Sequence, residues 1–271
     1  MNKKAISING FVANILLVLG LSIALNQLSY GEEPAKKQED EPAKKQADEP
    51  AKKQAEEPSA KDKELEKLAE SLKVSNGIKD KTVKDKTNAE IAIRYATIGE
   101  YSKAIEISKL LTDSLKSSTL IAITVKYAKS GEKSVDILAD ALDVARGIKN
   151  VPIKDKTISE IAIRYGEIDA YAKAVDVTKP LTDTQKSNAL IVITRRYAKS
   201  GQTTTEILDQ AVIVAKVIRD VPIKDKTLSE ISIRYAEMGD PVTGLETARL
   251  IKDDNIKSKA VQAIGKVKEK K

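Results

Sequence analysis

Lys84-Asp85-Lys86-Thr87-Asn88-Ala89-Glu90-Ile91-Ala92-Ile93-Arg94-Tyr95 is the stretch that decides the fold of this chain, because it returns twice at intervals of 70 residues. The related stretches run from Lys154 to Tyr165 and from Lys224 to Tyr235. In the other half of the period, Tyr127 to Gly131 returns as Tyr197 to Gly201. The tyrosines of these stretches, Tyr95, Tyr127, Tyr165, Tyr197 and Tyr235, are separated alternately by 32 and 38 residues, so the basic unit averages 35 residues. A period of about 20 to 50 residues is typical of a solenoid.

Each unit is predicted to be a hairpin of two helices. In the first helix, Ile91, Tyr95 and Ile98 are spaced as on one face of a helix, which argues against strands. A glycine in the left-handed conformation is expected to end this helix in four units, at Gly99, Gly131, Gly201 and Gly239. Asp169 stands at this position in one further unit.

Short polar residues before each hairpin are predicted to be helix N-caps. They are Asp80, Asp113, Asn150, Asp183, Asp220 and Asp253. Thr87 and Glu90, with their equivalents, offer capping boxes as an alternative start for some of the helices. The array opens with a single second helix and closes on the apolar stripe of Val261, Ile264 and Val267, and both ends are expected to act as caps. The sequence thus predicts an all-α fold, an α-solenoid of about twelve antiparallel helices over residues 61–271.

The repeat resembles the tetratricopeptide repeat. The matching positions are Ala92, Tyr95, Gly99, Tyr101 and Ala104, with Tyr165, Tyr171 and Ala174 in an equivalent unit. The large residue early in that family's first helix and its closing proline are missing, and Asp136 and Glu206 replace its alanine. The resemblance implies a degenerate member of this class of solenoid, in which the first helices line a concave face that binds the partner.

Two segments precede the repeats. Residues 1–31 have a basic start and an apolar stretch, which predicts a signal peptide cleaved between Gly31 and Glu32. An uncleaved membrane anchor is the alternative. Residues 32–60 repeat an octapeptide that begins Glu-Pro-Ala-Lys-Lys-Gln, and this pattern predicts a disordered tether. The protein is therefore expected in the periplasm or outside the cell.

The composition argues against catalysis. The chain contains no cysteine and no histidine, which removes thiolate nucleophiles, the commonest general base and the commonest ligand of transition metals. No glycine-rich phosphate loop is present, and no carboxylate pair stands in an apolar context. The sequence therefore predicts a protein that is not an enzyme, with no catalytic residue, no cofactor and no metal site.

Two recurrent sets have structural interpretations. The glutamates at Glu90, Glu160 and Glu230 precede Arg94, Arg164 and Arg234 by four residues, the spacing of an ion pair on a helix surface. Contact between these arginines and a ligand is the alternative. The recurrent tyrosines are expected in the hairpin cores.

A binding surface is predicted on the first helices. The residues two before each tyrosine should form its floor, and lysines should form its rim. The floor residues are Ile93, Val125, Ile163, Arg195 and Ile233, and the rim residues are Lys86, Lys129, Lys156, Lys199 and Lys226. An apolar floor with a basic rim suits an extended acidic or amphipathic peptide. Packing of the isoleucines against neighbouring helices is the alternative.

The leading hypothesis is therefore an exported scaffold or adaptor that binds another protein or peptide. The alternative is binding of an anionic envelope polymer or membrane surface, because the whole chain carries a net charge of +7. Nucleic acid is not expected, since the sequence combines an export signal with few aromatic residues.

Overall fold

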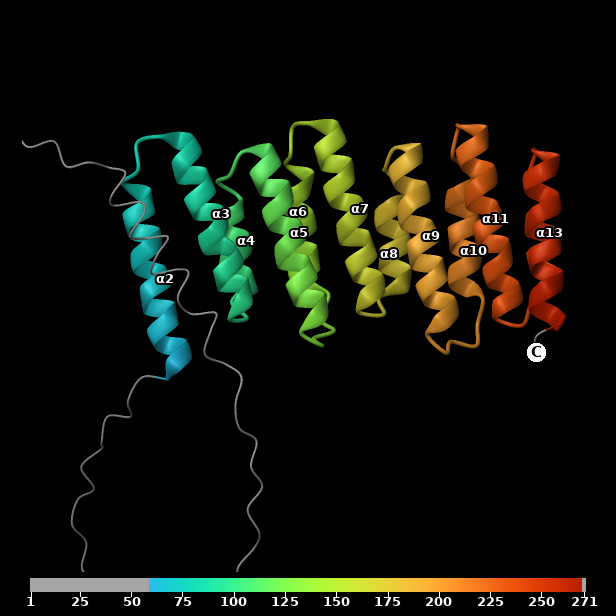
Figure 1. Cartoon of the computed structure of the whole chain (residues 1–271), viewed down its shortest axis with the longest axis horizontal. Coiled ribbons are helices and arrows are strands. Elements are labelled where there is room, and N and C mark those ends of the chain that lie inside the picture. The colour runs from blue at the N-terminus through green and yellow to red at the C-terminus, as the bar shows by residue number, and fades with distance from the viewer. Residues whose placement is uncertain (1–58, 270–271) are drawn as a thin grey trace, which may run out of the picture. The chain divides into compact units, whose positions relative to one another are not determined.

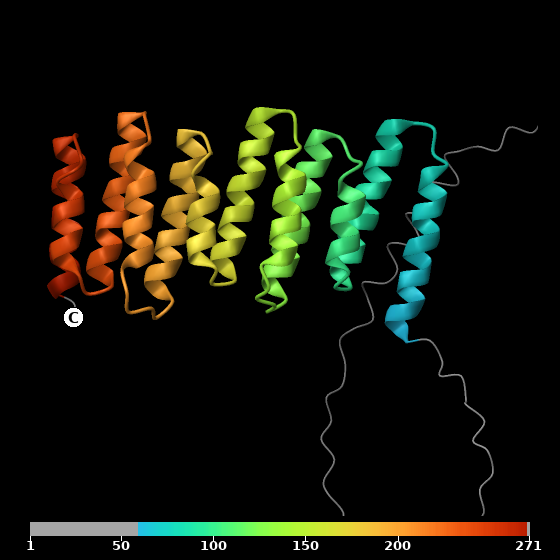
Figure 2. The ribbon, with the colours of Figure 1, turned by 180° about the vertical axis from the view of Figure 1, so that it is seen from behind.

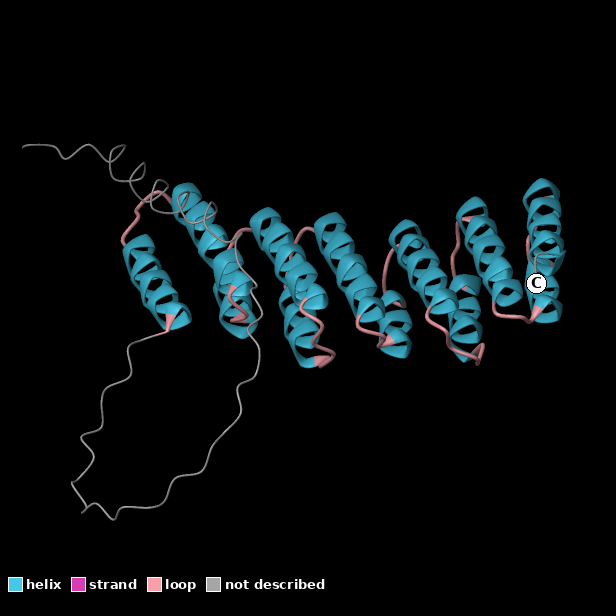
Figure 3. Ribbon diagram, turned by 60° about the horizontal axis from the view of Figure 1, so that its bottom comes forward, coloured by secondary structure: helices cyan, strands magenta, loops and turns pink. Residues whose placement is uncertain are grey.

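A computed structural model of the protein describes residues 59–269. The predicted signal peptide and all but the last two residues of the predicted tether lie outside the described residues. By its contacts the chain divides into two units, and Glu56–Lys271 contains every described helix. Within residues 59–269 the structure consists of twelve α-helices joined by loops, without a strand (Figure 3). The predicted all-α class and helix number are therefore confirmed.

The helices alternate between two layers (Figures 1 and 2). The A helices, each the first helix of a hairpin, are α3 (Lys81–Thr97), α5 (Asp113–Lys129), α7 (Val151–Glu167), α9 (Asp183–Lys199), α11 (Val221–Glu237) and α13 (Asp254–Glu269). The B helices, each the second helix, are α2 (Ala60–Asn76), α4 (Tyr101–Ser108), α6 (Asp136–Arg146), α8 (Tyr171–Thr178), α10 (Glu206–Lys216) and α12 (Pro241–Ala248). Each A helix packs on the next A helix along the row.

The period of 70 residues is exact in the structure. Helices α3, α7 and α11 each have 17 residues and start at Lys81, Val151 and Val221. Helix α6 repeats as α10, and α4 repeats as α8 and α12. The structural block is thus four helices, and the described row holds three such blocks.

Three of the predicted N-caps are confirmed at the starts of α3, α7 and α11. The side chains of Asp80, Asn150 and Asp220 accept hydrogen bonds from backbone amides three residues ahead, at 3.0, 3.1 and 3.0 Å. Asp253 likewise accepts from the amide of Ile256 at 2.9 Å, at the start of α13. The capping box predicted as an alternative at Thr87 is wrong, because Thr87 lies inside α3.

The predicted caps Asp113 and Asp183 are wrong. Both residues are the first residues of their helices, and the N-cap positions belong to Thr112 and Thr182, whose side chains make no capping bond. The carboxylates instead accept hydrogen bonds from the start of the next A helix. Asp113 binds the amides of Lys149 and Asn150 at 3.0 and 2.9 Å.

Every described junction between successive A helices contains such a bond. The acceptors, named here the junction carboxylates, are Asp85, Asp113, Asp155, Asp183 and Asp225. Asp183 binds the amides of Arg219 and Asp220 at 2.9 and 3.0 Å, and these bonds lower the pKa of its carboxyl. Asp225 is fully buried and binds the amide of Asp253 at 2.8 Å. A buried carboxylate is tolerated only with such donors.

The turns after the A helices follow the predicted pattern. The four predicted glycines have positive φ angles between 79° and 95°, and Asp169 has a φ of 66°. Asp169 therefore adopts the left-handed conformation that glycine provides elsewhere. The predicted tyrosine core is confirmed as well, since Tyr127 and Tyr165 are fully buried and Tyr95, Tyr197 and Tyr235 nearly so.

Candidate functional site

The predicted floor residues lie on the outer face of the A layer. Ile93, Val125, Ile163 and Ile233 are half-buried, and Arg195 is exposed. Ile163 and Ile233 pack against the hydrophobic core. The alternative prediction, that the isoleucines pack against neighbouring helices, therefore holds for part of the side chains of Ile163 and Ile233. The rest of each side chain remains accessible.

The predicted rim lysines are exposed, and they occupy opposite ends of the A helices. One set lies near the helix starts, at Lys86, Lys156 and Lys226, and the other at the last residues of α5 and α9, at Lys129 and Lys199. Because the A helices run in the same direction, the two sets lie on opposite sides of the floor residues. The structure therefore does not bring all the predicted residues into one pocket.

Glutamates on the same face were missing from the predicted site. Arg164 lies between Glu160 and Glu167, with nitrogen to oxygen distances of 3.3 and 2.9 Å. Arg234 is held in the same way by Glu230 and Glu237, at 3.3 and 2.7 Å. The predicted ion pairs are confirmed in α7 and α11. The spacing of three residues from Glu160 to Ile163 and from Glu230 to Ile233 was the signal that could have placed these two glutamates there.

Arg94, the remaining arginine of this series, contacts the preceding helix. Its guanidinium lies 3.6 Å from a carboxylate oxygen of Glu64 in α2. The three equivalent arginines therefore all face carboxylates. The outer face of α3, α7 and α11 therefore carries both acidic and basic side chains. The A helices between them, α5 and α9, have a different arrangement of charges.

A pocket of about 520 Å³ opens beside α9 and unites two of the predicted residues, Arg195 and Lys199. We name it the α9 pocket. It is lined by Glu167, Asp169, Tyr171, Val192, Arg195, Arg196, Lys199 and Ser200. Its walls thus come from the end of α7, the following turn, the start of α8 and one face of α9.

Hydrogen bonds fix the wall that α7 and α8 provide. The hydroxyl of Tyr171 donates a hydrogen bond of 3.1 Å to the carboxylate of Asp169. Lys133, in the loop between α5 and α6, forms an ion pair with the same carboxylate. The hydrogen bond from Lys133 lowers the pKa of Asp169, so this carboxylate is charged at neutral pH. Burial raises the pKa of Tyr171, which keeps its hydroxyl protonated as a donor.

The cations of the α9 pocket differ in their partners. Arg196 donates to the backbone oxygen of Glu167 at 3.0 Å, and Arg195 reaches Glu230 on α11 at 3.1 Å. Lys199 is exposed and forms no ion pair with a carboxylate of the described residues. Arginine in this setting retains unused donors, because a guanidinium has five N–H groups. The pocket is therefore equipped to bind an anionic group.

The α9 pocket is specific to one block. In α5, one period earlier, Val125 and Lys126 occupy the positions of Arg195 and Arg196. Relative to the preceding block, α9 therefore gains a cationic side chain at Arg195. Val125, one period earlier, shows from the sequence alone that Arg195 departs from the pattern, whereas Asp169 and Tyr171 could not be found in this way because the preceding hairpin contributes them.

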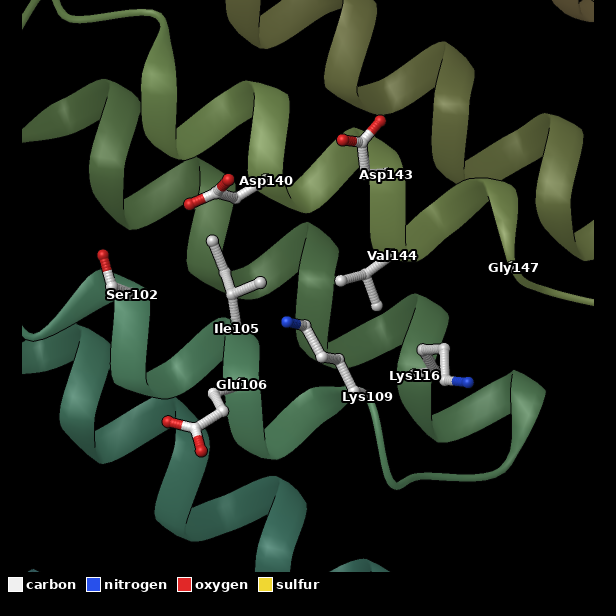
Figure 4. A pocket seen from close by; sticks show the side chains of 9 residues that line it. All are labelled: Ser102, Ile105, Glu106, Lys109, Lys116, Asp140, Asp143, Val144 and Gly147. Atoms are coloured by element: carbon white, nitrogen blue, oxygen red, sulfur yellow. The ribbon is translucent and has the colours of Figure 1, made fainter.

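A second pocket, of about 480 Å³, lies between α4 and α6 on the B layer (Figure 4). Its apolar part is made by Ile105 and Val144, and none of the predicted site residues lines it. Two of its three acidic lining residues, Glu106 and Asp143, form ion pairs with Lys103 and Arg146, each at 2.9 Å. Because these two carboxylates are already engaged in ion pairs, this pocket is the weaker candidate for ligand binding.

No family model and no curated protein matches the chain. The resemblance to the tetratricopeptide repeat therefore stays a prediction about family, whereas the helical solenoid is an observed architecture. Within residues 59–269, no helix combines the length and apolar character that crossing a bilayer requires.

Proposed function

We propose that this protein is an exported binding scaffold whose A layer holds an extended acidic peptide of another protein. The observation that carries the proposal is the convergence of Arg195, Arg196 and Lys199 on the α9 pocket. A carboxylate bound there would receive charge-assisted hydrogen bonds, which are among the stronger polar contacts. We propose binding, and no catalytic step, as the activity of the chain.

The surroundings of the pocket support an extended ligand. The accessible parts of Ile163 on α7 and Ile233 on α11 lie on the helices either side of α9. A peptide crossing three A helices would place an acidic side chain at α9 and apolar side chains at its neighbours. Alternating chemistry along an extended chain suits recognition by side-chain pockets.

Binding of a labelled peptide in which glutamate and leucine alternate tests this function on the full-length chain. Arg195→Val, which installs the residue found one period earlier, should weaken binding by roughly tenfold, the effect of losing one charged hydrogen bond. Arg146→Val on the B layer removes the same charge and should leave affinity unchanged. Equal weakening by both variants, or no binding of the peptide by the parent chain, would contradict the proposal.

A second candidate function is attachment to an anionic envelope polymer. The observation that favours it is the row of exposed lysines Lys86, Lys156 and Lys226, one in each block. Polyphosphate serves as the probe. Binding through this row would decrease steeply with salt and would respond to Lys156→Ala, whereas peptide binding in the α9 pocket would respond to Arg195→Val.

A further inference from the structure

The two ends of the helical row are complementary halves of one hairpin. Helix α13 is the periodic equivalent of α5 and α9, which are followed and packed by α6 and α10. Helix α2 is the equivalent of α6 and α10. Among the described residues, α13 packs on α11 and α12, and α2 packs on α3. The row thus presents an A helix at one end and the matching type of B helix at the other (Figure 1).

We infer that molecules of this chain associate head to tail, with α2 of one molecule packing on α13 of the next as α6 packs on α5. The alternation of A and B helices would then continue through the junction between molecules. A head-to-tail contact of this kind generates an open chain of molecules unless its rotation closes a ring. This inference does not depend on the proposed peptide binding.

Exposed apolar side chains at both ends support the association. On α12, Val242 and Leu245 are 66% and 37% exposed, and Val261 on α13 is 43% exposed. At the other end, Val74 on α2 is 38% exposed. A terminal repeat that acts only as a cap has a polar outer face. The exposed residues of α13 also include Lys259, Gln262 and Lys266, so its outer surface combines polar residues with Val261.

The internal B-layer pocket shows how two of these residues would meet. Leu245 is the periodic equivalent of Ile105 on α4, and Val74 is the equivalent of Val144 on α6. Ile105 and Val144 line the same pocket (Figure 4), where Ile105 is 2% exposed. The association would place Leu245 against Val74 of the next molecule in the same relation.

The junction carboxylates provide a second, independent complementarity. Asp253 is the periodic equivalent of Asp113 and Asp183, and its carboxylate binds the amide of Ile256 in its own helix. The amides that correspond to Lys149 and Asn150 are those of Lys79 and Asp80, and they have no acceptor among the described residues. In the associated pair, Asp253 of one molecule would accept from these two amides of the next.

The charges at the ends are also compatible. On α12 the groove side carries Glu246 and Arg249, and on α2 it carries Glu70 and Lys73, all exposed. Each side therefore offers one acid and one base. Lys67 of α2 replaces Ile137 of α6, which removes apolar surface from the contact. We therefore expect a reversible association that depends on concentration.

Engineered cysteines test the geometry, because the natural chain has none. Full-length protein carrying both Val74→Cys and Leu245→Cys should form a ladder of covalent oligomers with a short bis-maleimide. A mixture of the two single variants should give the dimer that contains one of each. The matched control, Ile105→Cys with Val144→Cys, occupies the same two positions of the internal groove and should react within one molecule.

The unmodified full-length chain provides a measurement free of crosslinker. Its mass by light scattering should rise with concentration, and Val74→Glu combined with Leu245→Glu, which places two like charges against each other in the proposed contact, should abolish the rise while circular dichroism stays unchanged. A constant monomer mass at all concentrations would overturn the inference. Preferential crosslinking between two molecules of the Leu245→Cys variant would also overturn the inference, because that dimer requires two C-terminal ends to meet.

Discussion

Tyr235 of α11 donates a hydrogen bond of 2.5 Å to the carboxylate of Asp209 in α10, and of the three equivalent tyrosines Tyr95, Tyr165 and Tyr235 only this one has an aspartate at that position. One period earlier, Tyr165 is fully buried and its hydroxyl has no partner among the described residues. Ala139 stands where Asp209 would be. Burial raises the pKa of Tyr165 to about 12, so its unpaired hydroxyl stays protonated.

The two tyrosines should respond in opposite ways to loss of the hydroxyl. Tyr165→Phe is expected to leave stability unchanged or raise it by about 1 kcal/mol, because a buried group without a partner costs about 1 to 3 kcal/mol. Tyr235→Phe should lower stability by about 1 to 2 kcal/mol through loss of a bond to a charged acceptor. Urea unfolding of both variants measures the difference.

Introducing a hydrogen-bond acceptor for Tyr165 tests whether the missing partner causes this difference in stability. Ala139→Asp should stabilise the parent protein, and the gain should vanish in the background of Tyr165→Phe. A gain that persists there would show that the new carboxylate acts through something other than Tyr165.

The junction carboxylate Asp183 should make stability depend on pH. Its pKa is lowered from the usual 3.8 by hydrogen bonds from the amides of Asp220 and Arg219. A lowered pKa in the folded state contributes stability that is present above the unfolded value and is lost as pH falls through the folded value. Asp183→Asn should therefore be less stable than the parent at neutral pH and should converge with it as the pH falls through the lowered pKa of Asp183 in the folded state.

Thermal unfolding from neutral to acidic pH provides the measurement. Asp183→Ala, which also removes the acceptor, should be less stable than the parent throughout. A constant gap between the parent and Asp183→Asn at all pH values would show that the charge of this carboxylate is not involved.

Gly244 in α12 and Gly265 in α13 should give opposite results when replaced by alanine. A β-carbon on Gly244 would lie 2.6 Å from the backbone oxygen of Ser232, so α12 and α11 must separate. Overpacking of this kind costs about 1 to 3 kcal/mol. At Gly265 no atom lies within 4 Å, and alanine should stabilise the helix by up to about 1 kcal/mol. Chemical denaturation of both variants compares them directly.

The left-handed conformation of Asp169 should separate alanine from glycine. Asp169→Ala removes the contacts to Lys133 and Tyr171 and keeps a strained backbone, whereas Asp169→Gly removes the strain as well. The glycine variant should be more stable than the alanine variant by about 1 kcal/mol. Equal melting temperatures would mean that the turn relaxes when the aspartate is absent.

Local features of the fold were predictable because their causes lie close together in sequence. Asp80, Asn150 and Asp220 cap helices through amides three residues ahead. Asp113 and Asp183 have the same residue type and period, but the amides they bind lie 36 and 37 residues further on. Only the packing of successive A helices reveals that role.

The candidate site was predictable to the same limited extent. Periodicity placed Arg195 and Lys199 on the outer face of α9, and the α9 pocket contains both. Tyr171 and Asp169 reach that pocket from a different hairpin, and Arg195 is engaged by Glu230 of the next A helix. Such contacts depend on how the helices pack, which spacing within one helix does not encode.

The period of 70 residues, with four helices in every block, means that the length of the helical row can change without a change in the binding residues of any one block. Inserting or deleting one whole block would add or remove one example of each kind of junction and would require no new one. The length of the row can therefore be changed by duplication of a gene segment. Independently, substitutions within a single block, such as the one containing α9, can give that block its own binding specificity.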